Sequence, residues 1–264
     1  MLQSVEIVRS LVEARLSVLD ESQWMYHGSA HHDIKSLQPN RDEFMIDRAI
    51  GSHFAADKAV SQRFAAQGHS LYGGEKPKEP GVVYKAKAPP RSQLHVVHQQ
   101  NYRDKDGKVF AKQSDQDAIA SHVAGTVFSQ PEHKQMFKDW VKHARRVDDA
   151  TAEGIHASLS RGEAPSRKKF GDIAGSDKRN SFHAYVSNFG STLQEPRPGF
   201  KREVVDKYLG IMHKRGIKGL VYTNTSPMET HHDTHDDRTS NKVRSTKSYV
   251  IFHPHELELQ HDNS

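Results

Sequence analysis

The segment Trp24–Ser29, which reads Trp-Met-Tyr-His-Gly-Ser, constrains the fold more than any other part of the sequence. Aromatic and apolar residues followed by a glycine are typical of a strand that ends in a turn. Gly28 has no Cβ, so a ligand can approach its backbone closely. His27 offers two ring nitrogens beside that backbone, which donate or accept hydrogen bonds. We interpret the segment as a strand whose end binds a ligand, although an ordinary strand end has the same pattern.

The segment Gly51–Ala65 predicts a short strand that leads into a helix. Ala59, Val60 and Phe64 recur at helical spacing, and Asp57 lies near the expected helix start. The polar stretch 31–47 connects this unit to the first strand. Loops that follow a ligand-binding strand often carry function. We therefore expect residues 31–47 to form a loop that borders the same pocket.

These two segments resemble the ADP-ribosyltransferase superfamily, in particular its diphtheria-toxin-like and poly(ADP-ribose) polymerase branch. The first motif of that branch is a His-Gly pair on a strand, which His27 and Gly28 match. The second motif reads Gly-x-Tyr-Phe-Ala and is followed by a serine and an aromatic residue on the next helix. Here His53 stands at the tyrosine position, and the matching residues are Gly51, Phe54, Ala55, Ser61 and Phe64.

The third motif of that branch is a late strand of the form Glu-Tyr-[Ile/Val]-[Ile/Val]-aromatic-Asp, which Ser248–His253 resembles. Ser248 replaces the catalytic glutamate and His253 replaces the aspartate. The resemblance covers residues 24–100 and 181–260. It implies an α+β fold, with an ADP-ribosyltransferase-like split antiparallel β-sheet core, flanking helices and a helical insertion. We expect one domain over residues 1–264, in which residues 101–180 form the mostly helical insertion.

The resemblance also implies that NAD is the substrate and that nicotinamide is displaced through an oxocarbenium-like state, as in glycoside cleavage. By the family pattern, the Gly28 backbone and the Ser61 hydroxyl bind the nicotinamide amide, and His27 binds the adenosine ribose. Phe64 and His53 sandwich the nicotinamide ring, since an aromatic face suits a cationic pyridinium. Core packing is the alternative role for Phe54 and Phe64. The expected binding residues are Tyr26, His27, Gly28, Ser29, His53, Phe54, Ser61 and Phe64.

A replacement for the missing glutamate is expected in the loop that precedes the last strand. Tyr222-Thr223-Asn224 through Glu229 is similar to a Tyr-x-Asn-x-x-Glu run in some phage and mobile-element relatives, with a longer spacing here. Glu229 is thus the nearest carboxylate that could fold back to stabilise positive charge at C1′. A solvated loop residue is the alternative. The candidate catalytic residues are His27, Glu229 and Ser248.

Three functions follow from these observations. The leading hypothesis is a mono-ADP-ribosyltransferase that uses NAD to modify a macromolecule, either protein or nucleic acid. The second is a degenerate member of the same fold that binds NAD or ADP-ribose without transfer. The third is a metal-dependent hydrolase, because the segment 230–237 is rich in the histidines and aspartates that bind zinc. A solvated loop is the alternative for that segment, and no metal site is predicted.

The composition limits partners and location. Lys and Arg number 38 against 33 Asp and Glu, a net charge of +5 that permits an acidic partner without requiring one. The hydrophobic fraction of 34% leaves a lean core. The sequence has no cysteine, which excludes disulfides and thiolate metal sites. It has no apolar run that could cross a bilayer. We expect a soluble, cytoplasmic protein with no membrane partner.

The remaining periodicities predict further elements. Helices are expected at residues 2–20, 115–128, 131–149 and 201–215, where apolar residues recur on one face. Strands are expected at 82–87, 94–97, 219–222 and 248–252. Gly216 follows the helix 201–215 and is expected to cap its C-terminus.

Overall fold

The computed structural model describes residues 23–39, 41, 45–67, 79, 81–99, 101–103, 109–112, 114–145, 147–161, 195–224 and 246–262. The predicted helix at 2–20, Glu229 and the segment 230–237 lie outside the described residues.

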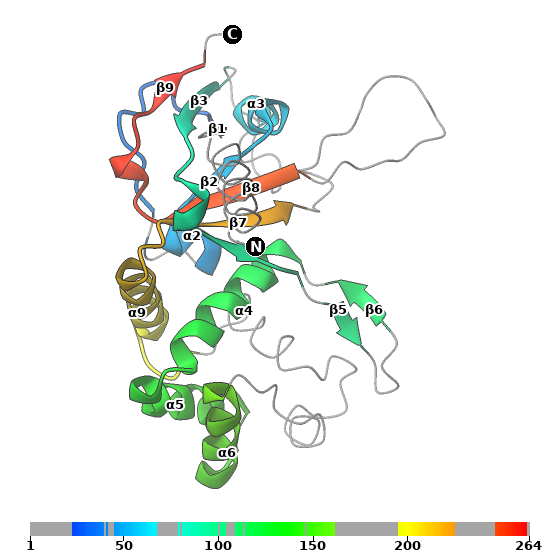
Figure 1. The fold of residues 1–264 in the computed structure, drawn as a ribbon, viewed down its shortest axis with the longest axis vertical. Coiled ribbons are helices and arrows are strands. Elements are labelled where there is room, and N and C mark those ends of the chain that lie inside the picture. Colours follow the sequence, from blue (N-terminus) through cyan, green and yellow to red (C-terminus); the bar gives the residue numbers. More distant parts are fainter. Residues whose placement is uncertain are drawn as a thin grey trace, which may run out of the picture.

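Seven strands form one mixed sheet in the order β4-β7-β8-β2-β1-β3-β9 (Figure 1). All neighbours are antiparallel except β4 and β7, which run parallel. The predicted α+β class is confirmed. The sheet departs from the predicted split antiparallel core at its β4 edge, where β4 and β7 run parallel. The strands are β1 Trp24–Ser29, β2 Ser52–Ala55, β3 Val82–Lys87, β4 Leu94–Val97, β7 Gly219–Asn224, β8 Thr246–Ile251 and β9 Gln260–His261.

Six α-helices and three short 3₁₀ turns accompany the sheet in the described part of the chain. The α-helices are α2 Ile46–Ile50, α3 Lys58–Gln67, α4 Asp115–Phe128, α5 Lys134–Arg145, α6 Asp149–Ser160 and α9 Phe200–Lys214. The 3₁₀ turns are η2 Arg91–Gln93, η3 Pro131–His133 and η4 Pro254–Glu256. The helices predicted at 115–128 and 201–215 are confirmed to within one residue at each end.

The region 101–180 differs from the prediction in two details. Residues 101–112 contain a two-stranded antiparallel sheet, β5 Asn101–Arg103 and β6 Val109–Lys112, which the sequence reading missed. The helix predicted at 131–149 consists instead of η3 and α5, and a separate helix, α6, begins at Asp149. The oxygen of Asp148 accepts a hydrogen bond from the Thr151 backbone N–H, which caps the start of α6. That this region is an insertion remains a prediction.

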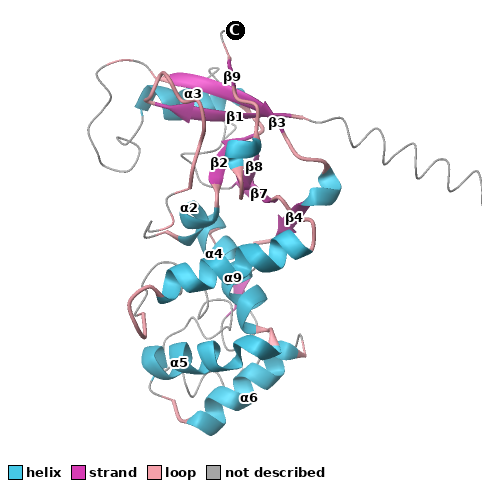
Figure 2. Cartoon of the chain, turned by 90° about the vertical axis from the view of Figure 1, so that its left-hand side faces the viewer, coloured by secondary structure: helices cyan, strands magenta, loops and turns pink. Residues whose placement is uncertain are grey.

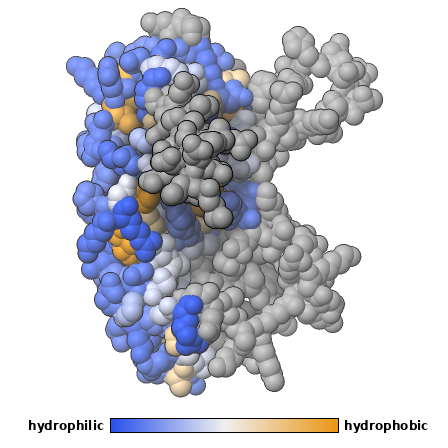
Figure 3. All heavy atoms as spheres, in the orientation of Figure 1, coloured by the Kyte–Doolittle hydropathy of each residue, from blue (hydrophilic) through white to orange (hydrophobic). Residues whose placement is uncertain are grey.

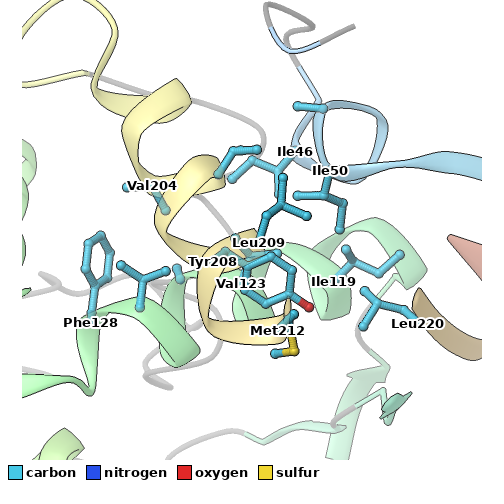
Figure 4. Packing of buried hydrophobic residues seen from close by; sticks show 14 of the residues in the cluster. Ile46, Ile50, Ile119, Val123, Phe128, Val204, Tyr208, Leu209, Met212 and Leu220 are labelled. Atoms are coloured by element: carbon cyan, nitrogen blue, oxygen red, sulfur yellow. The ribbon is translucent and has the colours of Figure 1, made fainter. Parts of the chain in front are cut away.

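One face of the sheet is buried under α2, α4 and α9. Figure 4 shows Ile119 and Val123 of α4 beside Tyr208 and Met212 of α9, with Leu220 of β7 at the same core. The face of α9 that the sequence predicted to be apolar is buried, namely Val204, Val205, Tyr208, Leu209 and Met212. Helix α4 therefore belongs to the same hydrophobic core as the sheet.

The end of α9 is set by Gly216, as predicted. Its φ of 70° lies in the left-handed region, which glycine adopts without steric cost. The backbone N–H of Gly216 donates to the carbonyl of His213, and that of Ile217 donates to the carbonyl of Met212. This cap turns the chain directly into β7.

The opposite face of the sheet carries a second, smaller core. It contains Met25 of β1, Phe54 of β2, Ala86 of β3, and Tyr249 and Ile251 of β8. Both faces of the central strands are thus buried, which explains why β8 has four consecutive buried residues at its end.

Helices α5 and α6 pack on each other at the end of the molecule remote from β1 and β3 (Figure 2). The Phe128 ring stacks on Trp140 with centroids 5.1 Å apart, and Phe137 packs edge-on against both rings. The described surface seen in Figure 3 is mostly hydrophilic, as the composition predicts. None of the described helices is long and apolar enough to span a bilayer.

Candidate functional site

The three predicted motifs lie on three neighbouring strands. β2 lies between β8 and β1, although β2 and β8 are far apart in the sequence. Tyr26 is registered with Ala55, Ala55 with Ser248, and Ser248 with Tyr222. Residues directly opposite each other in adjacent strands project to the same face of a sheet. These four residues therefore form one row across the sheet, which places Ser248 between the second motif and Tyr222.

Gly28 lies directly against α3. A Cβ on Gly28 would stand 2.0 Å from the carbonyl oxygen of Ser61 and 2.8 Å from the backbone nitrogen of Ala65. We expected the absent Cβ of Gly28 to leave room for a ligand. This explanation is wrong, because the backbone of α3 occupies that space. The contact nevertheless places Ser61 of the second motif against Gly28 of the first motif. Ser61 itself is buried.

His27 has a defined tautomer. Its Nδ1 lies 2.8 Å from the carbonyl oxygen of His53, and because a carbonyl only accepts, Nδ1 donates. Nε2 is then the acceptor nitrogen of a neutral ring. Burial lowers the pKa of His27, and this outweighs the hydrogen bond to His53, which raises it. The ring also packs at a tilt on Phe54, with centroids 5.5 Å apart. His27 is therefore neutral at pH 7 and fixed in orientation.

Both nitrogens of His53 face another side chain. Its Nδ1 lies 3.1 Å from the hydroxyl of Tyr222, and its Nε2 lies 3.3 Å from Oδ2 of Asp47. The contact between Nε2 and Asp47 is at ion-pair distance, but Nε2 makes no aligned hydrogen bond. The interaction is therefore electrostatic. The His53 side chain remains 34% exposed. The ring is thus held from both sides while part of it can meet a ligand.

Asp47 is a site residue that the sequence reading missed. It belongs to α2 instead of the predicted loop, and only 5% of its side chain is exposed. Burial raises the pKa of Asp47, but the contact with His53 and the charge of Arg48 lower it by more. The net shift of the pKa is therefore downward. Asp47 is therefore ionised at pH 7. The available signal was a single acidic residue within the apolar run that precedes Gly51.

The other predicted residues are either buried, as Phe54 and Ser248 are, or half-buried. Phe54 is buried in the second core, which favours the packing role for its side chain. Tyr26, Ser29 and Phe64 are half-buried near the same strands and helix. Ser248 is buried and carries no charge. The structure thus brings together Gly28, His53, Ser61 and Ser248, and it adds Asp47 and Tyr222 to them. The His27 ring lies with Phe54 on the opposite face of the sheet, and it contacts this group through the carbonyl of His53.

Two further features lie outside this cluster. A cavity of about 360 Å³ beside α3 is lined by Lys58, Val83, Asp262 and their neighbours, and by none of the motif residues. His253, His255 and Glu256, on and beside η4, offer ligand atoms within 4.8 Å of one another, and His255 and Glu256 are exposed. Both features lie apart from the row formed by Tyr26, Ala55, Ser248 and Tyr222.

Comparisons of this chain with protein-family models, curated proteins and solved structures give no match.

Proposed function

We propose that this chain is an NAD-dependent mono-ADP-ribosyltransferase with an ADP-ribosyltransferase-like fold. The observation that carries the proposal is the strand order β8-β2-β1, which brings the three motifs of the resembled superfamily side by side. His27 and His53, which are 26 positions apart in the sequence, are spatial neighbours. Ala55 and Ser248, which are more than a hundred positions apart, lie opposite each other on adjacent strands.

The proposed reaction transfers ADP-ribose from NAD to a nucleophile on protein or nucleic acid. The bond between C1′ and the pyridinium nitrogen breaks, and the bonding pair leaves with neutral nicotinamide. The acceptor forms the new bond to C1′ and releases its proton to solvent. Cleavage of this kind passes through an oxocarbenium-like state. A preorganised negative group beside C1′ accelerates it by stabilising the charge that develops.

The described residues fit the binding half of this reaction. His27 is neutral and holds one acceptor nitrogen, which suits a ribose hydroxyl. His53 presents part of an aromatic ring, and the nearby Asp47 carboxylate favours a cationic pyridinium over a neutral ring. Ser61 lies against Gly28, the pair that the resemblance assigns to the nicotinamide amide.

A second candidate function is binding of NAD or ADP-ribose without transfer. The observation that favours it is Ser248, which provides no charge at the position where the resembled family has its catalytic glutamate. The metal-dependent hydrolase rests on residues 230–237, outside the described part of the chain.

Calorimetric titration of the full chain with NAD, ADP-ribose and zinc separates these functions when combined with a transfer assay. The assay incubates the protein with NAD labelled on the adenosine side and a cell lysate, followed by nuclease or protease. We expect NAD binding and label that becomes resistant to one of the two treatments. NAD binding without label transfer would support the second candidate. Zinc binding without NAD binding would contradict the proposal and support the hydrolase.

A further inference from the structure

A carboxylate, an imidazole and a phenol from three different elements form a connected chain beside Ser248. Asp47 comes from α2, His53 from β2 and Tyr222 from β7. The contacts are 3.3 Å between Asp47 Oδ2 and His53 Nε2, and 3.1 Å between His53 Nδ1 and the Tyr222 hydroxyl. Asp47 and Tyr222 are both nearly buried. Polar groups in a low-dielectric setting polarise one another more strongly than they do in water.

The ionised state of Asp47 determines which groups donate and which accept hydrogen bonds along the series Asp47, His53 and Tyr222. In a neutral His53 ring, the negative charge of Asp47 favours the tautomer whose hydrogen is on Nε2, because that nitrogen lies 3.3 Å from Asp47 Oδ2. Nδ1 is then the acceptor, and the hydroxyl hydrogen of Tyr222 points to it. A phenol that donates its hydrogen keeps the lone pairs of its oxygen as acceptors. The negative charge of Asp47 is thus relayed as increased electron density on the Tyr222 oxygen.

The end of the chain lies next to the position of the missing glutamate. Tyr222 is registered directly opposite Ser248, and both residues project to the same face of the sheet. Side chains at such positions start with Cβ atoms about 4.5–5.5 Å apart. A glutamate at position 248 would therefore place its carboxylate close to the Tyr222 ring.

We propose that Asp47 acts through His53 and Tyr222 as a positioning residue that supplies, beside Ser248, the negative potential for cleavage of NAD. This inference rests on the proposed function. It adds no covalent step and moves no proton, because the chain only polarises the Tyr222 oxygen toward the charge that develops at C1′. Loss of one preorganised electrostatic group costs about 10²- to 10³-fold in rate.

The test compares NAD cleavage and NAD binding in Asp47→Asn and Tyr222→Phe with the parent protein. We expect kcat to fall about 10²-fold in each variant. The Kd for NAD should change by less than about 3-fold, because the charge acts on the transition state more than on the ground state. Asp115→Asn is the matched control, since Asp115 is also a buried carboxylate at a helix start but belongs to α4. We expect that control to keep its kcat.

Rescue distinguishes an electrostatic role from a purely structural one. Adding Ser248→Glu to Asp47→Asn places a carboxylate directly in the row, and we expect at least a 10-fold recovery of kcat. A structural defect at α2 would not respond to a charge on β8. Unchanged kcat in Asp47→Asn, or no recovery in the double variant, would overturn the inference while the proposed function stands.

Two more measurements complete the test. Nitrogen NMR of the parent protein reports the tautomer of the His53 ring and needs no variant. This measurement tests the inference even if Asp47→Asn fails to fold. Hydrogen on Nε2 supports the chain, and hydrogen on Nδ1 overturns it. A parent protein that binds NAD without cleaving it also overturns the inference, and one that does not bind NAD contradicts the proposed function itself. A loss of kcat in Glu229→Gln but not in Asp47→Asn would assign the charge to Glu229 instead.

Discussion

The carbonyl oxygen of Ser61 lies where a side chain on Gly28 would have to stand. An ideal Cβ on Gly28 would be 2.0 Å from that oxygen, far inside van der Waals contact. Strand β1 and helix α3 thus pack in direct backbone contact at Gly28. Any substitution of Gly28 tests this packing before it tests ligand binding.

We expect Gly28→Ala to lower the free energy of unfolding by roughly 2 kcal/mol or more, because overpacking forces the backbone of α3 away from β1. Denaturant unfolding followed by circular dichroism measures the change. Gly210→Ala in α9 is the matched control, since a Cβ there meets nothing within 4 Å. The control should be neutral or raise stability by about 0.5–1 kcal/mol, as for glycine in a helix interior. Equal stability of Gly28→Ala and the parent would contradict the described contact.

His122 makes stability depend on pH. It lies on α4 and stacks on His95, with ring centroids 4.2 Å apart, and burial together with the nearby His95 and Arg215 lowers its pKa to about 3. The unfolded chain takes up a proton near pH 6.5, whereas the folded chain does not do so until about pH 3. Stability from this residue is therefore complete above pH 6.5 and is lost as the pH falls toward 3.

Between pH 7 and pH 5 this loss amounts to about 2 kcal/mol from His122. Denaturant unfolding at pH 7, 6 and 5 measures it as the difference in slope between the parent and His122→Gln. Histidines that do not contact His122 contribute equally to both proteins and cancel in that difference. His31→Gln, an exposed histidine, should leave the slope unchanged. The same pH dependence in His122→Gln as in the parent would rule out this source.

Asp262 anchors β9 to the rest of the sheet. Its carboxylate is almost fully buried and lies 2.7 Å from Nζ of Lys58 and 3.4 Å from Nζ of Lys85. We expect Asp262→Ala to destabilise the protein by about 1–3 kcal/mol, because both ammonium groups lose a partner at a site shielded from water. Thermal unfolding measures the effect.

Glu153→Ala is the control for Asp262→Ala. Its ion pair with Lys134 joins α6 to α5 at an exposed place, where solvent screens the interaction. That variant should unfold at the parent temperature. If Asp262→Ala unfolds there too, the lysine contacts do not hold β9.

His27→Ala should weaken NAD binding if the proposed function is right. Loss of one hydrogen bond to a ribose hydroxyl costs about 1 kcal/mol, which corresponds to roughly a 5- to 10-fold rise in Kd. Calorimetry measures Kd, and far-ultraviolet circular dichroism checks that the fold is kept. His143→Ala, an exposed histidine on α5 at the end of the molecule remote from β1 (Figure 2), is the control with parent affinity. Unchanged affinity in a folded His27→Ala protein would remove His27 from the site.

The sequence predicted those elements whose pattern is local. The strands at 24–29, 82–87 and 94–97 and the helix at 115–128 lie where expected, because alternation or helical periodicity shows within each segment. The predicted motif residues His27, Gly28, His53 and Ser61 do meet. Their meeting followed from resemblance, since no local pattern says which strands become neighbours.

The sequence could not show features that depend on tertiary packing. Asp47 reads as part of a polar loop, and only the approach of β2 to α2 makes it a buried partner of His53. The parallel contact of β4 with β7 likewise joins distant segments without a local signal. Helix α6 has a weak apolar pattern, and its buried residues Ala152 and Ile155 gain a partner surface only from the folded core. Tertiary contacts override local propensity in each case.

The strand order also has a consequence for synthesis of the protein. β2 is made early, but its neighbour β8 is made only with residues 246–251, after all the helices named above have been synthesised. The row that joins Ala55, Ser248 and Tyr222 therefore cannot assemble on the ribosome until residues 246–251 have been synthesised. Non-local pairing of this kind slows folding. A nascent chain stalled before β8 would consequently lack the candidate site, however well its helices had formed.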